Sequence, residues 1–259
     1  MVYQNENKMT EPFKKFFLSS AIDYFAELQS SCVFEPICRG REACIVVQPS
    51  FDNSIPIVRT TTAYQLAAQA YSATHSKIQK DIVEACNMGK LEFNNIMVEL
   101  YSSLYRTMGE HSDQALDLEK DSFIALFSCY NTKNPQSLRK LVVKNKATLE
   151  TFAITLEQNS VVIFSTETNA KYLHKIVLER PREEEQWIGL TFRNSNTWVN
   201  FRDGVAYIDD NIKLTMANSE QLIDFRRMRA QENKNLDFIY PKIDFTTSPS
   251  DLLQIKGAV

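Results

Sequence analysis

The sequence predicts a mainly β fold, a sandwich or a barrel, with helices before and after it. Between residues 93 and 201, short segments rich in β-branched and aromatic residues follow one another, and turn-forming residues separate several of them. Apolar residues at helical spacing occur on either side of this region. Strands that do not alternate with helices favour a sandwich or barrel over a parallel sheet built from βαβ units.

Each element follows from its local pattern. Apolar residues recur every three or four positions over residues 12–30 and 63–86, which predicts two helices, and a third is expected near 219–229. Residues 239–253 are predicted to be irregular chain that wraps the core. The predicted strands cover residues 93–101, 122–130, 138–146, 151–158, 160–166, 172–179, 186–194 and 197–201.

Composition limits the classes of protein that remain. With 259 residues, 44% of them hydrophobic and 24% charged, the chain can bury a large core as one domain. A formal net charge of −3 excludes a basic field over the whole surface, so nucleic acid would need a local basic patch. Five cysteines without CxxC spacing argue against zinc and disulfides. Without a signal peptide or membrane-length apolar run, we expect an intracellular monomer of the cytoplasm or nucleus that has no membrane partner.

One short polar motif suggests a metal site. The chain has three histidines, and His111 stands two residues before Asp113 in MGEHSDQALDL. An ordinary polar turn would give the same triplet. His174 lies near the start of a later predicted strand, however, and two histidines with one carboxylate are the ligand set of non-haem Fe(II) oxygenases. His75 falls inside a predicted helix, and we interpret it as structural or solvated.

An ordered series of longer motifs surrounds these residues. FNNIMVELYSSLYRTMGEHSDQ contains Phe-Asn, a tyrosine eight residues later and Gly-Glu-His-x-Asp. DSFIALFSCY and RKLVVKNK follow as strands, NSVVIFSTETNAKYLHKIV contains Thr-Asn-x-x-Tyr-x-His, and GLTFRN closes the series. In this order the motifs resemble those of AlkB-like Fe(II)/2-oxoglutarate dioxygenases. The resemblance runs from about Ile55 to Arg193.

The resemblance implies a double-stranded β-helix, a jelly roll of α+β class with a mainly β core. Helices at the N-terminal side and a helical C-terminal extension would flank it. We expect residues 1–92 to form an N-terminal helical and lid part of the same domain, residues 93–201 the catalytic core, and residues 202–259 the extension.

The resemblance also implies the site. His111, Asp113 and His174 would be the catalytic residues and hold Fe(II), while Arg193 and Tyr101 would contact the 2-oxoglutarate cosubstrate. O2 is the second cosubstrate, and ascorbate would serve as the reductant in vitro. The expected reaction couples decarboxylation of 2-oxoglutarate to hydroxylation or demethylation of alkylated nucleic acid, with methylated DNA or RNA as the partner.

Three departures from the family pattern leave alternatives open. A second arginine usually stands six residues before the last one, where this chain has Trp187. A cofactor-binding asparagine is replaced by Glu99, which puts a negative charge near the cosubstrate unless it is paired. Nucleic-acid repair members carry an acid where this chain has Ala115. The alternatives are therefore a hydroxylase of a protein side chain or small metabolite, or a catalytically degenerate binding protein.

Basic and aromatic residues outside these motifs could contact a substrate or serve only the structure of the protein. Two basic clusters could bind phosphates or be solvated surface, and four aromatic residues could stack on a base or belong to the core. The clusters are Arg139, Lys140, Lys144 and Lys146 with Lys133 nearby, and Arg226, Arg227 and Arg229; the aromatic residues are Tyr64, Tyr71, Tyr105 and Trp198.

Overall fold

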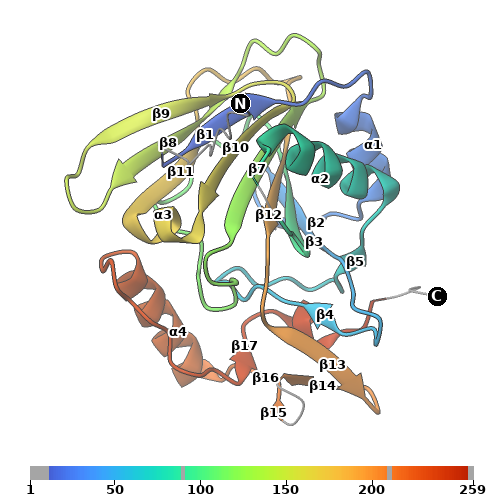
Figure 1. Cartoon of the computed structure of the whole chain (residues 1–259), viewed down its shortest axis with the longest axis vertical. Coiled ribbons are helices and arrows are strands. Elements are labelled where there is room, and N and C mark those ends of the chain that lie inside the picture. Colours follow the sequence, from blue (N-terminus) through green and yellow to red (C-terminus); the bar gives the residue numbers. More distant parts are fainter. Residues whose placement is uncertain (1–11, 89–90, 209–211, 256–259) are drawn as a thin grey trace, which may run out of the picture.

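The computed structural model describes residues 12–88, 91–208 and 212–255 (Figure 1). Its helices are α1 (Tyr24–Ser31), α2 (Ala73–Cys86), α3 (Thr166–Lys171) and α4 (Ser219–Glu232), with one 3-10 turn, η1 (Pro249–Leu252). Its strands are β1 (Lys14–Phe17), β2 (Glu35–Cys38), β3 (Arg41–Val47), β4 (Ile55–Pro56), β5 (Gln69–Ala70), β6 (Asn95–Tyr101), β7 (Phe123–Tyr130), β8 (Arg139–Asn145), β9 (Thr151–Leu156), β10 (Ser160–Ser165), β11 (Tyr172–Leu178), β12 (Trp187–Arg193), β13 (Trp198–Arg202), β14 (Val205–Ile208), β15 (Ile212–Lys213), β16 (Thr215–Met216) and β17 (Phe245–Thr246).

The larger sheet has the strand order β1-β10-β7-β12-β6-β3-β2, and β5 pairs with β3. Its central strands β7 and β12 are buried on both faces. Successive side chains of a strand point to opposite faces, so Ile188, Leu190 and Phe192 of β12 pack in the core that includes helices α1 and α2. Thr191 and Arg193 of the same strand point the other way, into a cavity. The alternation therefore divides β12 into a packing face and a functional face.

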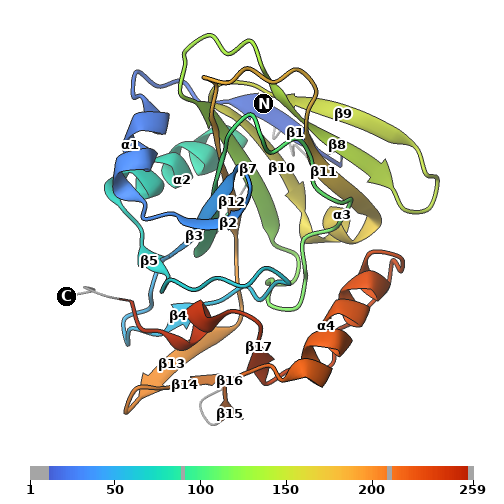
Figure 2. The same cartoon turned by 180° about the vertical axis from the view of Figure 1, so that it is seen from behind.

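The smaller sheet faces the larger one and has the order β11-β8-β9. Residues 107–111 run beside β11 and widen this sheet through two isolated β-bridges, Thr107 with Val177 and His111 with His174. A hydrophobic core drawn from both sheets fills the space between them. The two facing antiparallel sheets confirm the predicted double-stranded β-helix (Figures 1 and 2).

The C-terminal part lies beneath the sandwich (Figures 1 and 2). Strands β15, β14, β13 and β4 form a small sheet, and β16 pairs in parallel with β17. A buried ion pair joins this part to the core: both Asp117 carboxylate oxygens accept hydrogen bonds from Arg59, whose Nη1 also donates to the carbonyls of Ile243 and Phe245. In the described residues, no helix is long and apolar enough to cross a membrane.

All eight strands predicted between residues 93 and 201 are confirmed as β6 to β13. The C-terminal helix is confirmed as α4, and residues 239–253 are irregular apart from β17 and η1.

The two N-terminal helices were predicted too long. Lys14–Phe17 is a strand instead of helix, because its backbone pairs with the edge of β10, and α1 begins only after the N-cap Asp23. Helix α2 begins after Ser72, whose side chain forms a capping box with His75. His75 is thus structural, as one of the two readings predicted. Strands β2 and β3, which extend the larger sheet, were not predicted.

Candidate metal centre and its cavity

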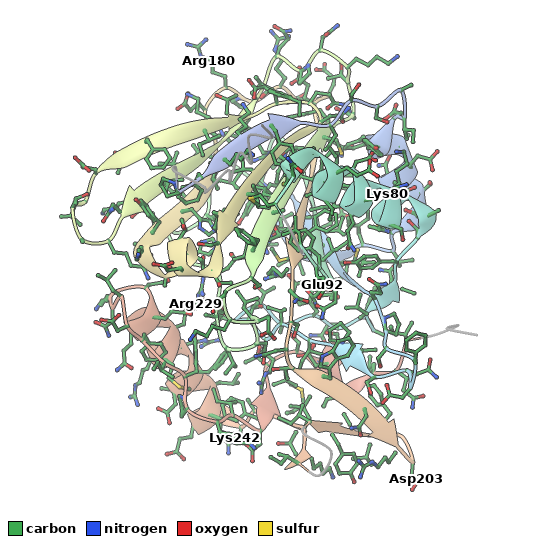
Figure 3. The ribbon with its side chains drawn as sticks, in the orientation of Figure 1. Lys80, Glu92, Arg180, Asp203, Arg229 and Lys242 are labelled. Atoms are coloured by element: carbon green, nitrogen blue, oxygen red, sulfur yellow. The ribbon has the colours of Figure 1, made fainter. Side chains whose placement is uncertain are left out.

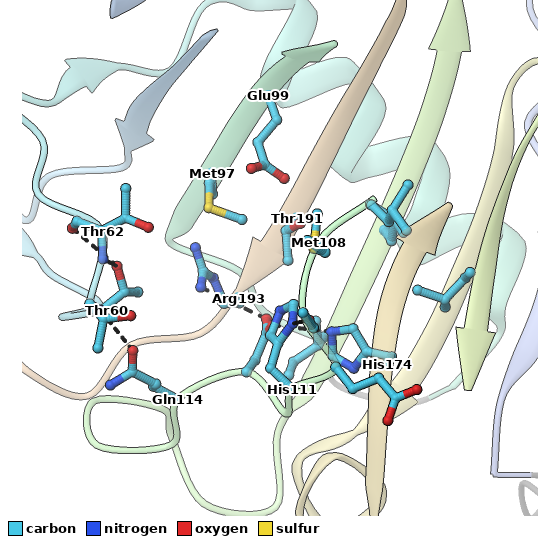
Figure 4. Close-up of a pocket in the computed structure, with 18 of the residues that line it drawn as sticks. Thr60, Thr62, Met97, Glu99, Met108, His111, Gln114, His174, Thr191 and Arg193 are labelled. Carbon is cyan, nitrogen blue, oxygen red and sulfur yellow. Dashed lines mark hydrogen bonds and ion pairs between the residues drawn. The ribbon is translucent and has the colours of Figure 1, made fainter. Parts of the chain in front are cut away.

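A cavity of about 330 Å³ opens between the two sheets. Strand β12 of the larger sheet supplies Thr191 and Arg193 to its wall, the bridge along β11 of the smaller sheet supplies His111 and His174, and the loop after His111 supplies Asp113 (Figure 4). The structure therefore brings together four of the five residues that the sequence predicted for the site.

The two histidines and the aspartate converge on one point. One ligand atom from each of His111, Asp113 and His174 lies within 4.8 Å of the other two. Asp113 Oδ1 is 3.4 Å from His174 Nε2 and 3.9 Å from His111 Nε2. The histidine backbones exchange both hydrogen bonds of an antiparallel pair, His111 N to His174 O at 3.0 Å and His174 N to His111 O at 2.6 Å. This pairing holds the imidazoles on the same side of the sheet.

The ionisation of the three groups suits a cation. Burial, together with the neighbouring His174, lowers the pKa of His111 to about 3, so its imidazole is neutral at neutral pH. Burial raises the pKa of Asp113, but the His174 hydrogen bond and the charge of Arg193 outweigh it and hold that pKa below the usual range. Neutral imidazoles and an ionised carboxylate are the forms that bind a metal.

The hydrogen bonds of His111 and Asp113 leave one ligand atom free on each residue. The Nδ1 of His111 lies 2.9 Å from the Gly109 carbonyl, which can only accept, so the proton is on Nδ1 and the Nε2 lone pair is available. Asp113 Oδ2 is buried and has no hydrogen-bond partner in the described part of the chain. A buried carboxylate oxygen without a donor is costly unless a cation meets it. The residues present therefore fit a divalent metal ion with nitrogen and oxygen ligands.

Asn169 fixes the backbone of Asp113. The Asp113 amide donates to Asn169 Oδ1 at 2.8 Å, and Asn169 Nδ2 donates back to the Asp113 carbonyl at 2.7 Å. Both residues are buried, Asn169 to 2% exposure. The family-like turn before His174 thus also positions the Asp113 backbone.

Helix α4 holds the same loop from outside the sandwich. Asn233, which caps the end of α4, accepts a hydrogen bond from the Ser112 amide at 3.0 Å, and Arg229 Nη1 donates to the Ser112 carbonyl at 3.3 Å. Glu232 Oε1 accepts the Ala115 amide at 2.8 Å. Figure 3 shows Arg229 on the side of α4 that faces the sandwich. None of these three interactions was predicted from the sequence, because no pattern within α4 shows where it docks.

Arg193 is a buried cation beside the metal ligands. Its Nη1 lies 3.8 Å from Asp113 Oδ2, and its Nε has no hydrogen-bond partner among the described residues. A guanidinium with free donors can bind a carboxylate through two hydrogen bonds. The position predicted for a cosubstrate contact is therefore occupied by a residue that can make one.

Tyr101 lies deeper than predicted and is not on the cavity wall. It is fully buried against the Trp187 indole, with ring centroids 5.0 Å apart. Trp187 folds back over Gly189, where a Cβ would collide with the indole ring of Trp187. Arg139 stacks behind both rings, 4.8 Å from the Tyr101 centroid. The indole thus fills the space next to β12 where the family pattern has an arginine.

Glu99 is paired, which answers the question its charge raised. Its Oε1 lies 2.6 Å from Arg41 Nη2, and both residues line the cavity. Arg41 comes from β3, the unpredicted neighbour of β6. The sequence indicated only that Glu99, if buried, would need a cation as its partner. Nothing in the sequence identified Arg41 as that cation.

The first predicted basic cluster is dispersed. Arg139 is buried, and its terminal nitrogens donate to the carbonyls of Ser102 and Tyr105. Lys140 pairs with Glu179, and Lys146 donates to the Glu232 carbonyl. Lys144 pairs with Glu110. In the second cluster, Arg227 pairs with Asp224, and Arg229 donates to the Ser112 carbonyl.

The four aromatic residues proposed for base stacking do not line the cavity. Tyr64 is buried in the protein, and Tyr71 packs against the core beneath α2. Tyr105 stacks on Tyr101, with ring centroids 4.5 Å apart. Trp198 lies in β13, beneath the sandwich. These positions favour the core and scattered-surface readings of the aromatic residues.

Comparison with known proteins places the chain in a family. The model of the 2OG-Fe(II) oxygenase superfamily matches residues 27–196, more than half of the chain. The solved structure of OsALKBH1 matches with a TM-score of 0.50 and 16% identity, covering 72% of this chain and 100% of that one. A Pseudomonas putida prolyl-4-hydroxylase matches with a TM-score of 0.43 and 13% identity over 72% of this chain and 95% of its own. No curated protein matches.

The chain belongs to the 2OG-Fe(II) oxygenase superfamily and is an oxidoreductase. This superfamily implies Fe(II), 2-oxoglutarate and O2. Its fold is AlkB-like, in agreement with the resemblance found in the sequence. Helix α4 lies outside the matched residues.

Proposed function

We propose that this chain is an AlkB-like dioxygenase that holds Fe(II) with His111, Asp113 and His174 and hydroxylates alkylated or methylated nucleic acid. The observation that carries the proposal is the convergence of these three groups on one point of a cavity, next to Arg193. When bound, Fe(II) and 2-oxoglutarate supply oxidative chemistry that forms succinate and CO2 and, from an N-methyl substrate, formaldehyde.

The protein's own residues orient the reactants. Arg193 binds a carboxylate of 2-oxoglutarate next to the metal, because its Nε is unpaired and the site around it is buried. Apolar side chains from both sheets, among them Leu126, Phe164 and Ile176, line the same cavity and exclude water from the reacting groups.

The charges at the cavity mouth support a nucleic-acid substrate. Glu110 lines the cavity and is shared by two lysines, Lys175 at 3.0 Å and Lys144 at 3.6 Å. Arg229 adds a third cation to the wall. Because three cations outnumber one acid here, a phosphate backbone would find a local positive patch on a chain of negative net charge. The AlkB-like fold adds support of a general kind.

Ala115 favours a second candidate, a hydroxylase of a protein side chain or small metabolite. A methyl side chain cannot accept a hydrogen bond from a base. The nearest acid from α4, Glu232, already accepts hydrogen bonds from the Ala115 amide and the Tyr240 hydroxyl. A flipped base that depended on an acid at this position would lose a hydrogen bond.

Succinate formation separates these possibilities. Purified protein with Fe(II), ascorbate and O2 is assayed beside Asp113→Ala, first alone and then with methylated oligonucleotides, methylated nucleosides and peptides. We expect turnover that one oligonucleotide stimulates and that Asp113→Ala abolishes. Stimulation only by peptides or small molecules would support the second candidate, and turnover unaffected by Asp113→Ala would refute the metal assignment.

A further inference from the structure

The end of the cavity beyond Arg193 holds a second arginine. Figure 4 shows Glu99 beyond Thr191 and Arg193, away from His111. Arg41 reaches this carboxylate from β3 and lines the cavity with it. The side chain of Arg41 is 15% exposed and that of Glu99 is 4% exposed, so the pair is largely shielded from bulk solvent.

Several donors around this pair have no acceptor. Arg41 Nε, the Tyr64 hydroxyl and the Tyr101 hydroxyl are buried and make no hydrogen bond within the described ranges. Tyr101 pairs with Arg41 in the ladder between β3 and β6. Burial and the charge of Glu99 raise the pKa of both tyrosines, so their hydroxyls stay protonated donors. Of these donors, only Arg41 Nε belongs to a residue of the cavity lining in the described part of the chain, so a ligand that accepts hydrogen bonds can reach it.

The other candidate cation at this depth is already engaged. Both terminal nitrogens of Arg139 donate to backbone carbonyls at 2.8 Å. The rings of Tyr101 and Trp187 lie over its guanidinium, and it does not line the cavity. Arg41 is therefore the cation that a ligand at this end of the cavity would meet.

We propose that Arg41 binds the distal carboxylate of 2-oxoglutarate and replaces the arginine that Trp187 displaces from the last strand. This inference rests on the proposed function, because it assumes that 2-oxoglutarate chelates a metal held by the triad. Arg193 then binds the carboxylate of 2-oxoglutarate next to the metal, and Arg41 binds the carboxylate at the far end of the same molecule.

Glu99 sets how strongly the distal carboxylate is held. A guanidinium has five N–H donors, and Glu99 uses the Nη2 side of Arg41 while Nε stays free. Arg41 can therefore hold Glu99 and the ligand at once. Because Glu99 neutralises Arg41 and repels a second carboxylate, it weakens the binding of 2-oxoglutarate relative to an uncharged residue at position 99.

Binding of two related acids isolates the distal carboxylate. 2-Oxoglutarate and 2-oxopentanoate chelate a metal identically, but the second has a methyl group in place of the distal carboxylate. Calorimetric titration of the Fe(II)-loaded protein without O2 gives the ratio of their dissociation constants, with no turnover. The variants are Glu99→Gln and the double variant Arg41→Met/Glu99→Gln, which leaves no buried carboxylate unpaired. Arg227→Met, which removes an exposed arginine of α4 that does not line the cavity, is the control.

We expect wild type to prefer 2-oxoglutarate by about 10- to 100-fold, the range of a charge-assisted hydrogen bond. Glu99→Gln raises this preference, the double variant reduces it to near one, and Arg227→Met leaves it unchanged. A double variant that keeps the preference of Glu99→Gln would overturn the role of Arg41. Equal binding of both acids to wild type would refute this inference alone, whereas binding of neither acid would also refute the proposed function.

Discussion

Replacement of Asn169 by alanine tests how the metal-binding loop is positioned. Asn169 touches no ligand in the proposed mechanism, but it makes both hydrogen bonds to the backbone of Asp113. Alanine removes both bonds and leaves a buried amide and a buried carbonyl without partners, because Asp113 is only 8% exposed. The Asp113 carboxylate keeps its chemistry and loses its fixed position.

The size of the effect follows from these two groups. An unsatisfied buried backbone group costs about 1–3 kcal/mol, so Asn169→Ala should lower the free energy of unfolding of the metal-free protein by about 2–6 kcal/mol. The support of a ligand by its neighbours is typically worth about 10- to 100-fold in metal affinity. We expect Fe(II) affinity to fall by that factor.

A matched control exists next to the ends of β6 and β12. Asn94 makes the same reciprocal pair with the backbone of Ser195, with both hydrogen bonds at 2.8 Å. Asn94→Ala should therefore destabilise the protein through the same loss, while Fe(II) affinity stays near that of wild type because Ser195 holds no ligand. Urea unfolding measures the first quantity, and anaerobic Fe(II) titration measures the second.

The comparison between the two variants is decisive. If Asn169→Ala and Asn94→Ala lose Fe(II) affinity equally, the loss reflects general destabilisation, and Asn169 does not position Asp113 specifically. An Asn169→Ala protein with unchanged Fe(II) affinity would refute the reasoning more directly, since the Asp113 backbone would then need no support to present its carboxylate.

Three further predictions concern stability and the substrate. Burial raises the pKa of Asp251 to about 6, so its contribution to stability is present at low pH and is lost as pH rises from about 4 through 6. Asp251→Asn should gain melting temperature relative to wild type across that window; a constant difference would contradict this sign. Arg59→Met should lower the free energy of unfolding by about 3–5 kcal/mol in urea, because Asp117 stays buried without its partner, and Asp117→Asn should restore much of the loss. Glutamine at Lys144 and Lys175 should reduce the log-log salt dependence of methylated oligonucleotide binding by about one unit for each phosphate that a lysine no longer neutralises, and an unchanged slope would place the phosphates elsewhere.

The strands that could be predicted from the sequence are those whose local residue pattern is typical of a strand. From β6 to β13, β-branched and aromatic segments are separated by turns, so each strand is visible locally. Strand β1 depends on a partner far along the chain, because Lys14–Phe17 finds its hydrogen bonds on β10. A helical spacing of its phenylalanines could not reveal that pairing. Local patterns fail where tertiary hydrogen bonds override them.

In the candidate site, too, residues in local motifs could be predicted, and residues that depend on tertiary contacts could not. His111, Asp113 and His174 were predicted because their motifs survive in the sequence, and the structure brings them together. Arg41 was missed because a cation that pairs with Glu99 could come from any neighbouring strand. The sequence showed that Trp187 stands where the family pattern has an arginine. It did not show that the indole crosses Gly189 and fills the space beside β12.

The C-terminal extension belongs to the site although it lies outside the family match. Helix α4 docks through Phe225, which packs with Ile243 and Phe245 in a core of its own. Once docked, its last turn hydrogen-bonds the loop that carries Asp113 at three backbone atoms. The loop conformation, and with it the position of the carboxylate, therefore depends on a small core about 100 residues further along the chain. Arg229 comes from the same helix, so the docking that positions the Asp113 loop also places a cation on the wall of the cavity.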